Sequence, residues 1–341
     1  MADIALISGV SVTTISHVVN KTRSVSPETE RAVLAAIAET GYMPDNVVRT
    51  LRRVGSQTVG LAMSMMSNPY FGDVVRGIET AATRSDYSLL LAETHDDVAS
   101  ELRAVSDLLS RRVEAIILAP SADPVRALQH AEHQGVPVVL IDRFMNADLD
   151  QIGVENIEPT AGLVDHLCSI GHRRIGMVSG RPGLSTTEER TVGFRQGLRR
   201  NRLRFYSDYL VSGDSDDETA EQALLQLLSL PKPPTAIVVG NNRMTIGVMR
   251  AARDARVRIP EDLAIVSFDD FEWADLFHPS LTAVAQPTKA MGEQALQLVL
   301  SRLADPSTPT RRVVMRSQFV HRESCGCAPQ ALTSAPPGRS A

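Results

Sequence analysis

Polar and charged side chains stand at or near the ends of several apolar segments of this sequence. They are Asp142, Arg143, Arg190, Asn241, Asn242, Asp269 and Gln286. Carboxylates and amides offer acceptors, and amides and guanidinium groups offer donors, so together they could hold a small ligand rich in hydroxyl groups. Any one of them could instead cap a strand or form a salt bridge, although a purely structural role for the whole set would be unusual. The residue types therefore favour the binding of a small ligand.

Motifs of the common enzyme classes do not occur in this sequence. No G-x-G-x-x-G follows the first apolar segment of the body, and G-x-x-x-x-G-K-[ST], G-x-S-x-G and H-E-x-x-H are absent. His130 and His133 share a helical face without a third ligand, which favours a solvated surface. Cys325 and Cys327 form a C-x-C pair with one further ligand nearby, His321. We therefore predict that the chain is not an enzyme and has no metal site and no cofactor.

Length and composition are those of a soluble globular protein. A chain of 341 residues with 43% hydrophobic and 22% charged residues suits two or three domains. The three cysteines are an odd number and suggest no disulfide framework. Residues 1–19 lack the basic start and apolar core of a signal peptide, and no apolar run is long enough to cross a bilayer. We expect a cytoplasmic location and no membrane partner.

The net charge of −5 is unevenly distributed along the chain. Residues 1–53 carry six Lys/Arg and five Asp/Glu, whereas the remaining residues carry 29 and 35. An acidic body fits a protein that touches nucleic acid only through its first residues, although so small a basic excess would not reveal such a role by itself.

Residues 9–20, GVSVTTISHVVN, predict a tight turn followed by a short helix. Gly9 can adopt the backbone conformation of the turn, and Ser11 is a good N-cap. At helical spacing, Ile15, Val18 and Val19 share the inner face. The opposite face carries Val12, Thr13, Ser16 and His17. Short side chains of this kind allow a helix to enter the major groove of DNA and to reach the base edges.

Two further helices should flank this one. A short helix is predicted at Asp3–Ser8, and a third helix begins with Ser26 as N-cap and Pro27 as its first residue and is closed by Gly41. Its buried stripe is Val33, Leu34 and Ile37. The same pattern occurs in ordinary three-helix domains, so the pattern alone leaves a helical bundle without a nucleic-acid partner open.

The residues themselves are more specific than the pattern. Residues 9–20, 25–31 (VSPETER) and 41–46 (GYMPDN) closely resemble the DNA-binding domain of the lactose-repressor (LacI/GalR) family, and the resemblance continues to about residue 325. It implies that Val12, Thr13 and His17 contact bases. It also implies that Ser11, Thr14, Ser16 and Asn20 mostly hold phosphates. His17 stands where the family commonly has Arg, so the preferred operator should differ.

The resemblance extends into the segment Asp45–Gly55, which would be a hinge helix that orders on DNA. Leu51 matches the leucine that wedges into the minor groove at the operator centre, and Arg49, Arg52 and Arg53 could bind the flanking phosphates. A plain basic linker is the alternative. Family members usually carry several more residues before the position of Asp3, which a misassigned start codon would explain.

From residue 57 onward, short apolar segments alternate with amphipathic helical segments. Predicted strands are Thr58–Met65, Ser88–Ala92, Ala115–Ala119, Val136–Ile141, Arg174–Ser179, Tyr209–Val211, Ala236–Val239, Leu263–Phe268 and Leu281–Ala285. This alternation is typical of parallel sheets covered by helices on both faces, and there are too many strands for one sheet. The predicted class is therefore α/β, with two doubly wound lobes.

The family resemblance adds the domain plan of a type I periplasmic-binding-protein-like body behind a helix-turn-helix head. The implied domains are a DNA-binding domain at 1–44, a hinge at 45–56, an effector-binding body at 57–327 and a disordered tail at 328–341. Within the body, the N-lobe is 57–157 and 288–317, and the C-lobe is 158–286 and 318–327. Crossings between lobes should fall near Glu155–Pro159, Gln286–Thr288 and Ser317–Val320.

The resemblance also assigns roles around the cleft between the lobes. Asp142, Arg190, Asn241, Asp269 and Gln286 match positions that hold the effector in family members, Tyr70 and Phe71 match aromatic pocket positions, and Arg143 follows Asp142 at the same strand end. An aromatic residue that is frequent near Ser215 is missing, and Asn242 replaces a frequent aspartate. These two departures leave the ligand open between classes, with a pentose or hexose as the leading prediction and a nucleobase as the second.

Together these expectations describe a transcriptional regulator, and a repressor is the first prediction. Its affinity for a near-palindromic operator would depend on a small effector. The tail lacks the heptad leucines of a tetramerising helix, so a homodimer is expected. The resemblance implies release by an inducer more often than corepression. A solute-binding protein of a transport or sensing system, without DNA binding, is the alternative, because it would share the two-lobed body.

Overall fold

The computed structural model describes residues 5, 7–20, 25–40, 55–64 and 68–327. The chain forms two compact units, residues 1–56 and residues 57–341. The predicted hinge residues Arg49 and Leu51 lie outside the described residues. Among the described residues, no helix is both long enough and apolar enough to cross a membrane.

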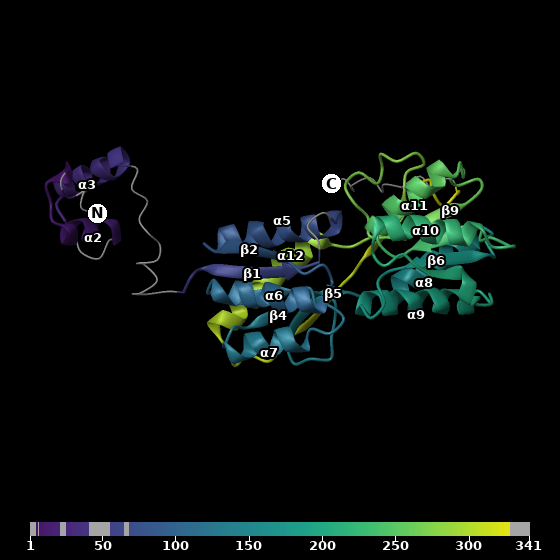
Figure 1. Cartoon of the computed structure of the whole chain (residues 1–341), viewed down its shortest axis with the longest axis horizontal. Coiled ribbons are helices and arrows are strands. Elements are labelled where there is room, and N and C mark those ends of the chain that lie inside the picture. The colour runs from purple at the N-terminus through teal and green to yellow at the C-terminus, as the bar shows by residue number, and fades with distance from the viewer. Residues whose placement is uncertain (1–4, 6, 21–24, 41–54, 65–67, 328–341) are drawn as a thin grey trace, which may run out of the picture. The chain divides into compact units, whose positions relative to one another are not determined.

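The described part of the first unit includes the helices α2 (Val12–Asn20) and α3 (Pro27–Thr40) (Figure 1). Residues 5, 7 and 8, within the predicted helix Asp3–Ser8, are also helical. Both α2 and α3 begin at the predicted N-cap: Ser11 Oγ accepts a hydrogen bond from Thr14 N at 3.1 Å, and Ser26 Oγ accepts one from Thr29 N at 3.2 Å. Gly9 precedes α2 with a φ of 69°, the left-handed conformation that glycine adopts without strain. The core of the unit contains Ile15, Val18, Val33 and Ala36, with Ala5, Val10 and Val25 packed against it.

The N-lobe of the second unit is a sheet with the strand order β11-β5-β4-β3-β1-β2, in which all pairs are parallel. Its strands are β1 (Thr58–Met63), β2 (Ser88–Glu93), β3 (Ala115–Leu118), β4 (Val138–Asp142), β5 (Asp150–Val154) and β11 (Arg312–Met315). Helices α5 (Pro69–Arg84) and α12 (Thr288–Ala304) pack on one face, and α6 (Val98–Ser110) and α7 (Val125–His133) on the other (Figure 1).

The C-lobe repeats this architecture with the order β12-β10-β9-β8-β6-β7, in which only β12 is antiparallel to its neighbour. Its strands are β6 (Ile175–Ser179), β7 (Leu210–Ser212), β8 (Ala236–Val239), β9 (Ala264–Phe268), β10 (Thr282–Ala285) and β12 (Gln318–Val320), with a short 3-10 helix, η1 (Ser207–Tyr209), before β7. Helices α8 (Ile157–Ser169) and α9 (Ser185–Arg200) cover one face, and α10 (Asp217–Leu228) and α11 (Asn242–Asp254) the other.

The central strands of both sheets are short uninterrupted apolar runs because both of their faces are buried. Ala115–Leu118 reads AIIL and Ala236–Val239 reads AIVV, and every residue of both strands is buried. The two-lobed α/β class predicted from the alternation of strands and helices is therefore confirmed.

The chain passes between the two sheets three times. It does so between β5 and α8, between β10 and α12, and between β11 and β12. The first crossing is shorter than predicted, because α8 begins at Ile157 and already contains Pro159. Proline is tolerated there because the amide groups of the first helical turn have no acceptor within the helix.

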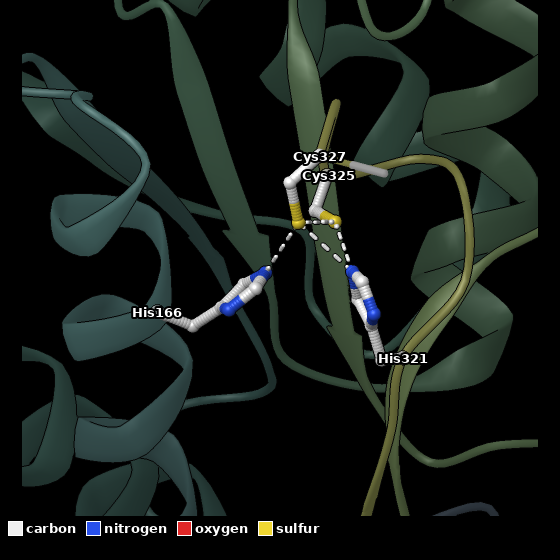
Figure 2. Close-up of side chains that lie close together, drawn as sticks. All are labelled: His166, His321, Cys325 and Cys327. Carbon is white, nitrogen blue, oxygen red and sulfur yellow. Dashed lines mark hydrogen bonds between the residues drawn. The ribbon is translucent and has the colours of Figure 1, made fainter. Parts of the chain in front are cut away.

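The last described segment of the chain, residues 321–327, returns to α8. There the side chains of His321, Cys325 and Cys327 meet His166, which α8 contributes (Figure 2). The sequence had offered only His321 as a partner for the C-x-C pair. His166 was missed because it lies 155 residues before His321 and only the fold brings the two together.

Candidate ligand-binding cleft and nucleic-acid interface

The cleft between the two lobes lies at the carboxyl ends of both sets of parallel strands, where open α/β sheets bind ligands. Its lining includes Tyr70, Phe71, Asp142 and Arg143 from the N-lobe and Arg190, Asn241 and Asp269 from the C-lobe. The cavity measures about 50 Å³, which has room for only a few water molecules. The cleft is therefore narrow in this form of the body.

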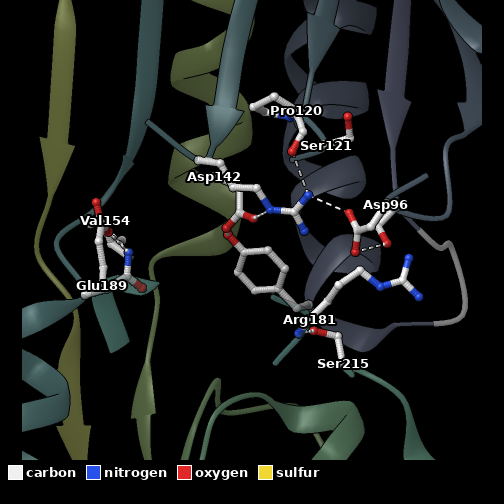
Figure 3. Close-up of polar contacts among 12 residues, drawn as sticks. Asp96, Pro120, Ser121, Asp142, Val154, Arg181, Glu189 and Ser215 are labelled. Carbon is white, nitrogen blue, oxygen red and sulfur yellow. Dashed lines mark hydrogen bonds and ion pairs between the residues drawn. The ribbon is translucent and has the colours of Figure 1, made fainter. Parts of the chain in front are cut away.

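On the N-lobe side, the guanidinium of Arg143 is held by its own lobe. Arg143 Nη1 donates to Asp96 Oδ1 at 2.5 Å and to the Pro120 carbonyl oxygen at 2.8 Å (Figure 3). Arg143 Nε lies 3.4 Å from Asp142 Oδ2, and Tyr70 Oη donates to Asp142 Oδ1 at 2.6 Å. This side is a chain of alternating donors and acceptors, and the charge of Arg143 is compensated inside the lobe.

On the C-lobe side, Arg190 is held mainly by neutral oxygens. Arg190 Nε donates to Asn156 Oδ1 at 2.9 Å, and Nη1 donates to the Gly240 carbonyl oxygen at 2.6 Å. The carboxylate of Asp269 is farther away, at 3.6 Å from Nη1. The Arg190 guanidinium also lies 3.8 Å above the centroid of the Phe268 ring, a cation–π contact.

Gln286 does not line the cavity, but it connects the two sides. Its Nε2 donates to Asp269 Oδ1 at 2.5 Å, and its Oε1 lies 3.5 Å from Tyr70 Oη. Because Gln286 lies on the crossing between β10 and α12, it touches a residue of each lobe.

Asp142 and Asp269 occupy matching places, at or just after the carboxyl ends of β4 and β9, and both have a left-handed backbone, with φ of 72° and 70°. Such φ values are uncommon outside glycine, although aspartate tolerates them better than most residues. Backbone strain of this kind is found where a site must aim a side chain. Here it turns one carboxylate from each lobe into the cleft.

Burial and nearby charges shift the pKa values of three side chains in the cleft. Burial, followed by the nearby carboxylates of Asp142 and Asp269, raises the pKa of Tyr70 well above 10.0, so its hydroxyl is a neutral donor. Burial also raises the pKa of Asp269, and Arg190 opposes this shift. For Arg143, burial alone would lower the pKa, but Asp96 and Asp142 outweigh it and raise the pKa.

A hydrogen bond joins the two lobes beside the cleft. Arg181, which follows β6 in the C-lobe, donates from Nη1 to the His95 carbonyl oxygen of the N-lobe at 3.0 Å. Its own lobe positions Arg181, through Asp214 at 3.2 Å from Nε and through Ser215 Oγ, which accepts from the Arg181 amide at 3.0 Å (Figure 3).

The structure brings all eight predicted effector residues to this cleft, seven as lining and Gln286 through its hydrogen bonds. Asn241 is also the N-cap of α11, since its Oδ1 accepts a hydrogen bond from Met244 N at 2.8 Å. That oxygen therefore has a structural role, as the sequence analysis left open. Sequence reasoning missed further polar residues of the lining. They are Ser64, Asn68, Asp96, Thr186, Thr187, Ser215 and Arg243. Most lie in strand-end loops or first helical turns, so counting those positions at the same sheet edge would have found them.

In the first unit, the outer face of α2 is accessible. Val12 is 47% exposed, and Ser11 and Thr13 are exposed. Thr14 and His17 are half-buried, and the side chains of Ser16 and Asn20 lie outside the described residues. The inner face of the same helix is buried, with Ile15 at 0%. A helix with one buried apolar face and one accessible face of small side chains is the form that reads base edges.

A two-lobed body with a ligand cleft, preceded by a small helical unit, defines a class of ligand-responsive regulators. Residues 1–45 match the family model "Bacterial regulatory proteins, lacI family", and residues 164–325 match that of a periplasmic-binding-protein-like domain. The ribose operon repressor of Escherichia coli K12 is 31% identical over 327 residues, which cover 95% of this chain and 99% of that protein. The repressor PurR of Photobacterium profundum is 30% identical over 324 residues, covering 94% and 97%.

Solved structures agree with these matches. The Lac repressor dimer bound to operator and the anti-inducer ONPF superposes with a TM-score of 0.82 at 26% identity, covering 95% of this chain and 98% of that one. The regulator CelR in complex with cellobiose gives a TM-score of 0.73 at 27% identity, covering 94% and 98%. The chain belongs to the lacI family of bacterial regulatory proteins. It is a DNA-binding transcriptional regulator and not an enzyme, which confirms the main prediction over the solute-binding alternative.

Proposed function

We propose that the chain is a cytoplasmic repressor that binds a near-palindromic operator as a homodimer and changes its operator affinity when a small hydroxylated effector enters the cleft. In this proposal residues 1–44 read DNA, residues 45–56 form the hinge and residues 57–327 sense the effector. Val12, Thr13 and His17 contact bases, Ser11, Thr14, Ser16 and Asn20 hold phosphates, and Leu51 and Arg49 act at the operator centre.

The observation that carries the proposal is the composition of the cleft. It presents a neutral phenol at Tyr70 and carboxylates at Asp142 and Asp269. It also presents the Arg190 guanidinium, which bonds mainly to neutral oxygens and lies 3.6 Å from the Asp269 carboxylate. Vicinal hydroxyl groups, which both donate and accept, match such an alternation of donors and acceptors. The relatives named as ribose operon repressors support a pentose as the first candidate, and a nucleobase remains the second candidate.

The position of the cleft between the two lobes explains how an effector could act at a distance. Because residues of both lobes line the cleft, we expect an effector bound there to change the angle between the lobes. Such a hinge motion moves one lobe against the other and, in a dimer, against its mate. A coupling of about 1–3 kcal/mol between effector and operator is typical of such linkage.

Isothermal titration calorimetry of the full chain tests this function, with ribose, other pentoses, hexoses, cellobiose and purine bases as probes. One pentose or hexose should bind, and Arg190→Ala should abolish the heat signal. Arg199→Ala is the matched control, because Arg199 lies on the same helix and is exposed. Failure of every probe to bind, or equal loss in both variants, would refute the assignment of the effector class and of the cleft.

A further inference from the structure

A second group of side chains with binding chemistry lies in the C-lobe, formed by His166, His321, Cys325 and Cys327. Their four ligand atoms all lie within 4.8 Å of one another. His321 Nε2 is 2.9 Å from Cys327 Sγ and 3.3 Å from Cys325 Sγ, and the two sulfurs are 3.3 Å apart. His166 Nε2 completes the group at 3.6 Å from Cys327 Sγ (Figure 2).

These spacings are close to those that a tetrahedral metal ion imposes. With Zn–S bonds of about 2.3 Å and Zn–N bonds of about 2.0 Å, neighbouring ligand atoms lie roughly 3.3–3.8 Å apart. The four pairs at 2.9–3.6 Å would need shifts of about 0.6 Å or less to reach that geometry. The remaining pairs, at up to 4.8 Å, would have to approach by as much as roughly 1–1.5 Å. Two sulfurs with two imidazole nitrogens form the donor set for which zinc is the typical ion.

The backbone that presents the two sulfurs is held by contacts outside the group. Gly326 has a φ of 87°, which allows the chain to turn between Cys325 and Cys327, and its amide donates to the Glu323 carbonyl oxygen at 2.9 Å. Ser324, fully buried, donates from Oγ to the Ile265 carbonyl oxygen at 2.6 Å. Cys325 is itself 0% exposed. The C-x-C turn is therefore anchored to β9 independently of any contact between its sulfurs.

The two imidazole rings are also fixed from outside. Phe319 stacks on His321 with ring centroids 6.2 Å apart and an interplanar angle of 16°, and its ring centroid lies 5.0 Å from that of His166. Rings positioned in this way keep both Nε2 atoms directed at the sulfurs. Such pre-positioning of ligands by neighbouring groups is characteristic of metal sites in proteins.

We propose that His166, His321, Cys325 and Cys327 form a tetrahedral zinc site that fastens the end of the body to α8. Four protein ligands complete the coordination of the ion, so the site is structural and not catalytic. It ties residues 321–327, which follow the antiparallel edge strand β12, to the helix on the adjoining face of the C-lobe. The site is separate from the effector cleft, since none of its four residues lines that cavity.

Metal analysis of the full chain, purified under reducing conditions and dialysed, tests the site directly. We expect about one zinc ion per chain, because a tetrahedral site holds one ion. Cys325→Ser and His166→Asn should each lose it. Cys168→Ala is the thiol control, because Cys168 lies on α8 two residues after His166 and outside the group, and His130→Gln is the imidazole control; both should retain the metal. A metal-free wild-type chain that does not take up added zinc would overturn the proposal, as would equal loss in the controls.

Cobalt substitution and alkylation keep the test valid even if a variant fails to fold. The wild-type chain loaded with Co²⁺ should show the intense visible bands of a tetrahedral ion together with sulfur-to-cobalt charge transfer. A chelator should then make Cys325 and Cys327 reactive toward iodoacetamide, read by mass spectrometry of the peptide. Weak, octahedral-type bands would contradict the site. So would thiols that become reactive only after a reductant is added, because that result identifies a Cys325–Cys327 disulfide.

Discussion

The two lobes share one architecture, but they hold their buried arginines in different ways. In the N-lobe, Arg143 contacts the carboxylates of Asp96 and Asp142 and a carbonyl oxygen, all from its own lobe. In the C-lobe, Arg190 contacts one carboxylate at 3.6 Å and is otherwise bonded to neutral oxygens. Arg143 therefore mainly stabilises its own lobe. The positive charge of Arg190 is less compensated by carboxylates and can interact with a ligand.

Exchanging each arginine for methionine should separate these two roles most clearly. Arg143→Met removes the cation between two buried carboxylates and should cost about 3–5 kcal/mol of unfolding free energy. Arg190→Met should cost less stability but weaken effector binding by about 100-fold, the equivalent of two charge-assisted hydrogen bonds at roughly 1.5 kcal/mol each. Urea unfolding and calorimetry measure the two effects. Equal stability losses would mean that the lobes do not differ in this respect.

Helix packing offers a point where the lobes should behave alike. A Cβ added to Gly77 on α5 would lie 2.2 Å from the Lys289 carbonyl oxygen, and one added to Gly247 on α11 would lie 2.0 Å from that of Asp217. Because backbone atoms cannot move aside easily, Gly77→Ala and Gly247→Ala should each lose about 1–3 kcal/mol.

Gly72→Ala is the matched control for the helix packing, because Gly72 is also on α5 and a Cβ there would meet nothing within 4 Å. That variant should gain up to about 1 kcal/mol from helix propensity. Thermal unfolding read by circular dichroism distinguishes the three variants. A stable Gly247→Ala protein would show that the helices of the C-lobe can separate at little cost.

The pH dependence of stability should reveal the buried carboxylate of the C-lobe. Burial raises the pKa of Asp269 above 3.8 in the folded chain, so the folded state takes up a proton at a higher pH than the unfolded state. As the pH falls from neutral through this raised pKa, wild-type stability should therefore improve relative to Asp269→Asn. Paired urea titrations from pH 7 downward provide the measurement. A difference that stays constant, or that favours the variant at lower pH, would contradict the assignment.

The smallest expected effect concerns the contact that joins the lobes. Arg181 is partly exposed and donates to the His95 carbonyl oxygen of the other lobe. Arg181→Ala should favour a more open form by less than about 1 kcal/mol, as is usual for exposed charged contacts. The expected readout is a faster association of the effector in stopped-flow fluorescence, with stability almost unchanged. A slower association would show that the contact helps the ligand to enter.

Residue type and spacing predicted the elements that depend mainly on residues near one another in the sequence. The N-caps Ser11 and Ser26, the inner face of α2 and the continuous apolar strands at the centre of each sheet follow from residue type and spacing alone. Most of the predicted effector residues lie at the cleft because the carboxyl ends of parallel strands meet at one edge.

Features that depend on partners distant in the sequence were not predicted. Strand β5 begins with Asp150, which is only 2% exposed, and a buried carboxylate argues against a core strand. Its charge is compensated by Arg302 at 2.9 Å and by the Arg311 amide at 2.9 Å, more than 150 residues away. His166 was missed for the same reason. The roles of both residues depend on neighbours that only the fold supplies.

Selection of operator sequences from a pool of random DNA duplexes tests the central claim most directly. At about 150 mM salt the full chain should enrich a near-palindromic sequence, with half-site centres about one helical turn apart. Thr13→Ala should alter the enriched bases, and the effector found by calorimetry should change the retained fraction. Enrichment of no sequence, or of the same sequence by the wild type and by Thr13→Ala, would contradict base reading by α2.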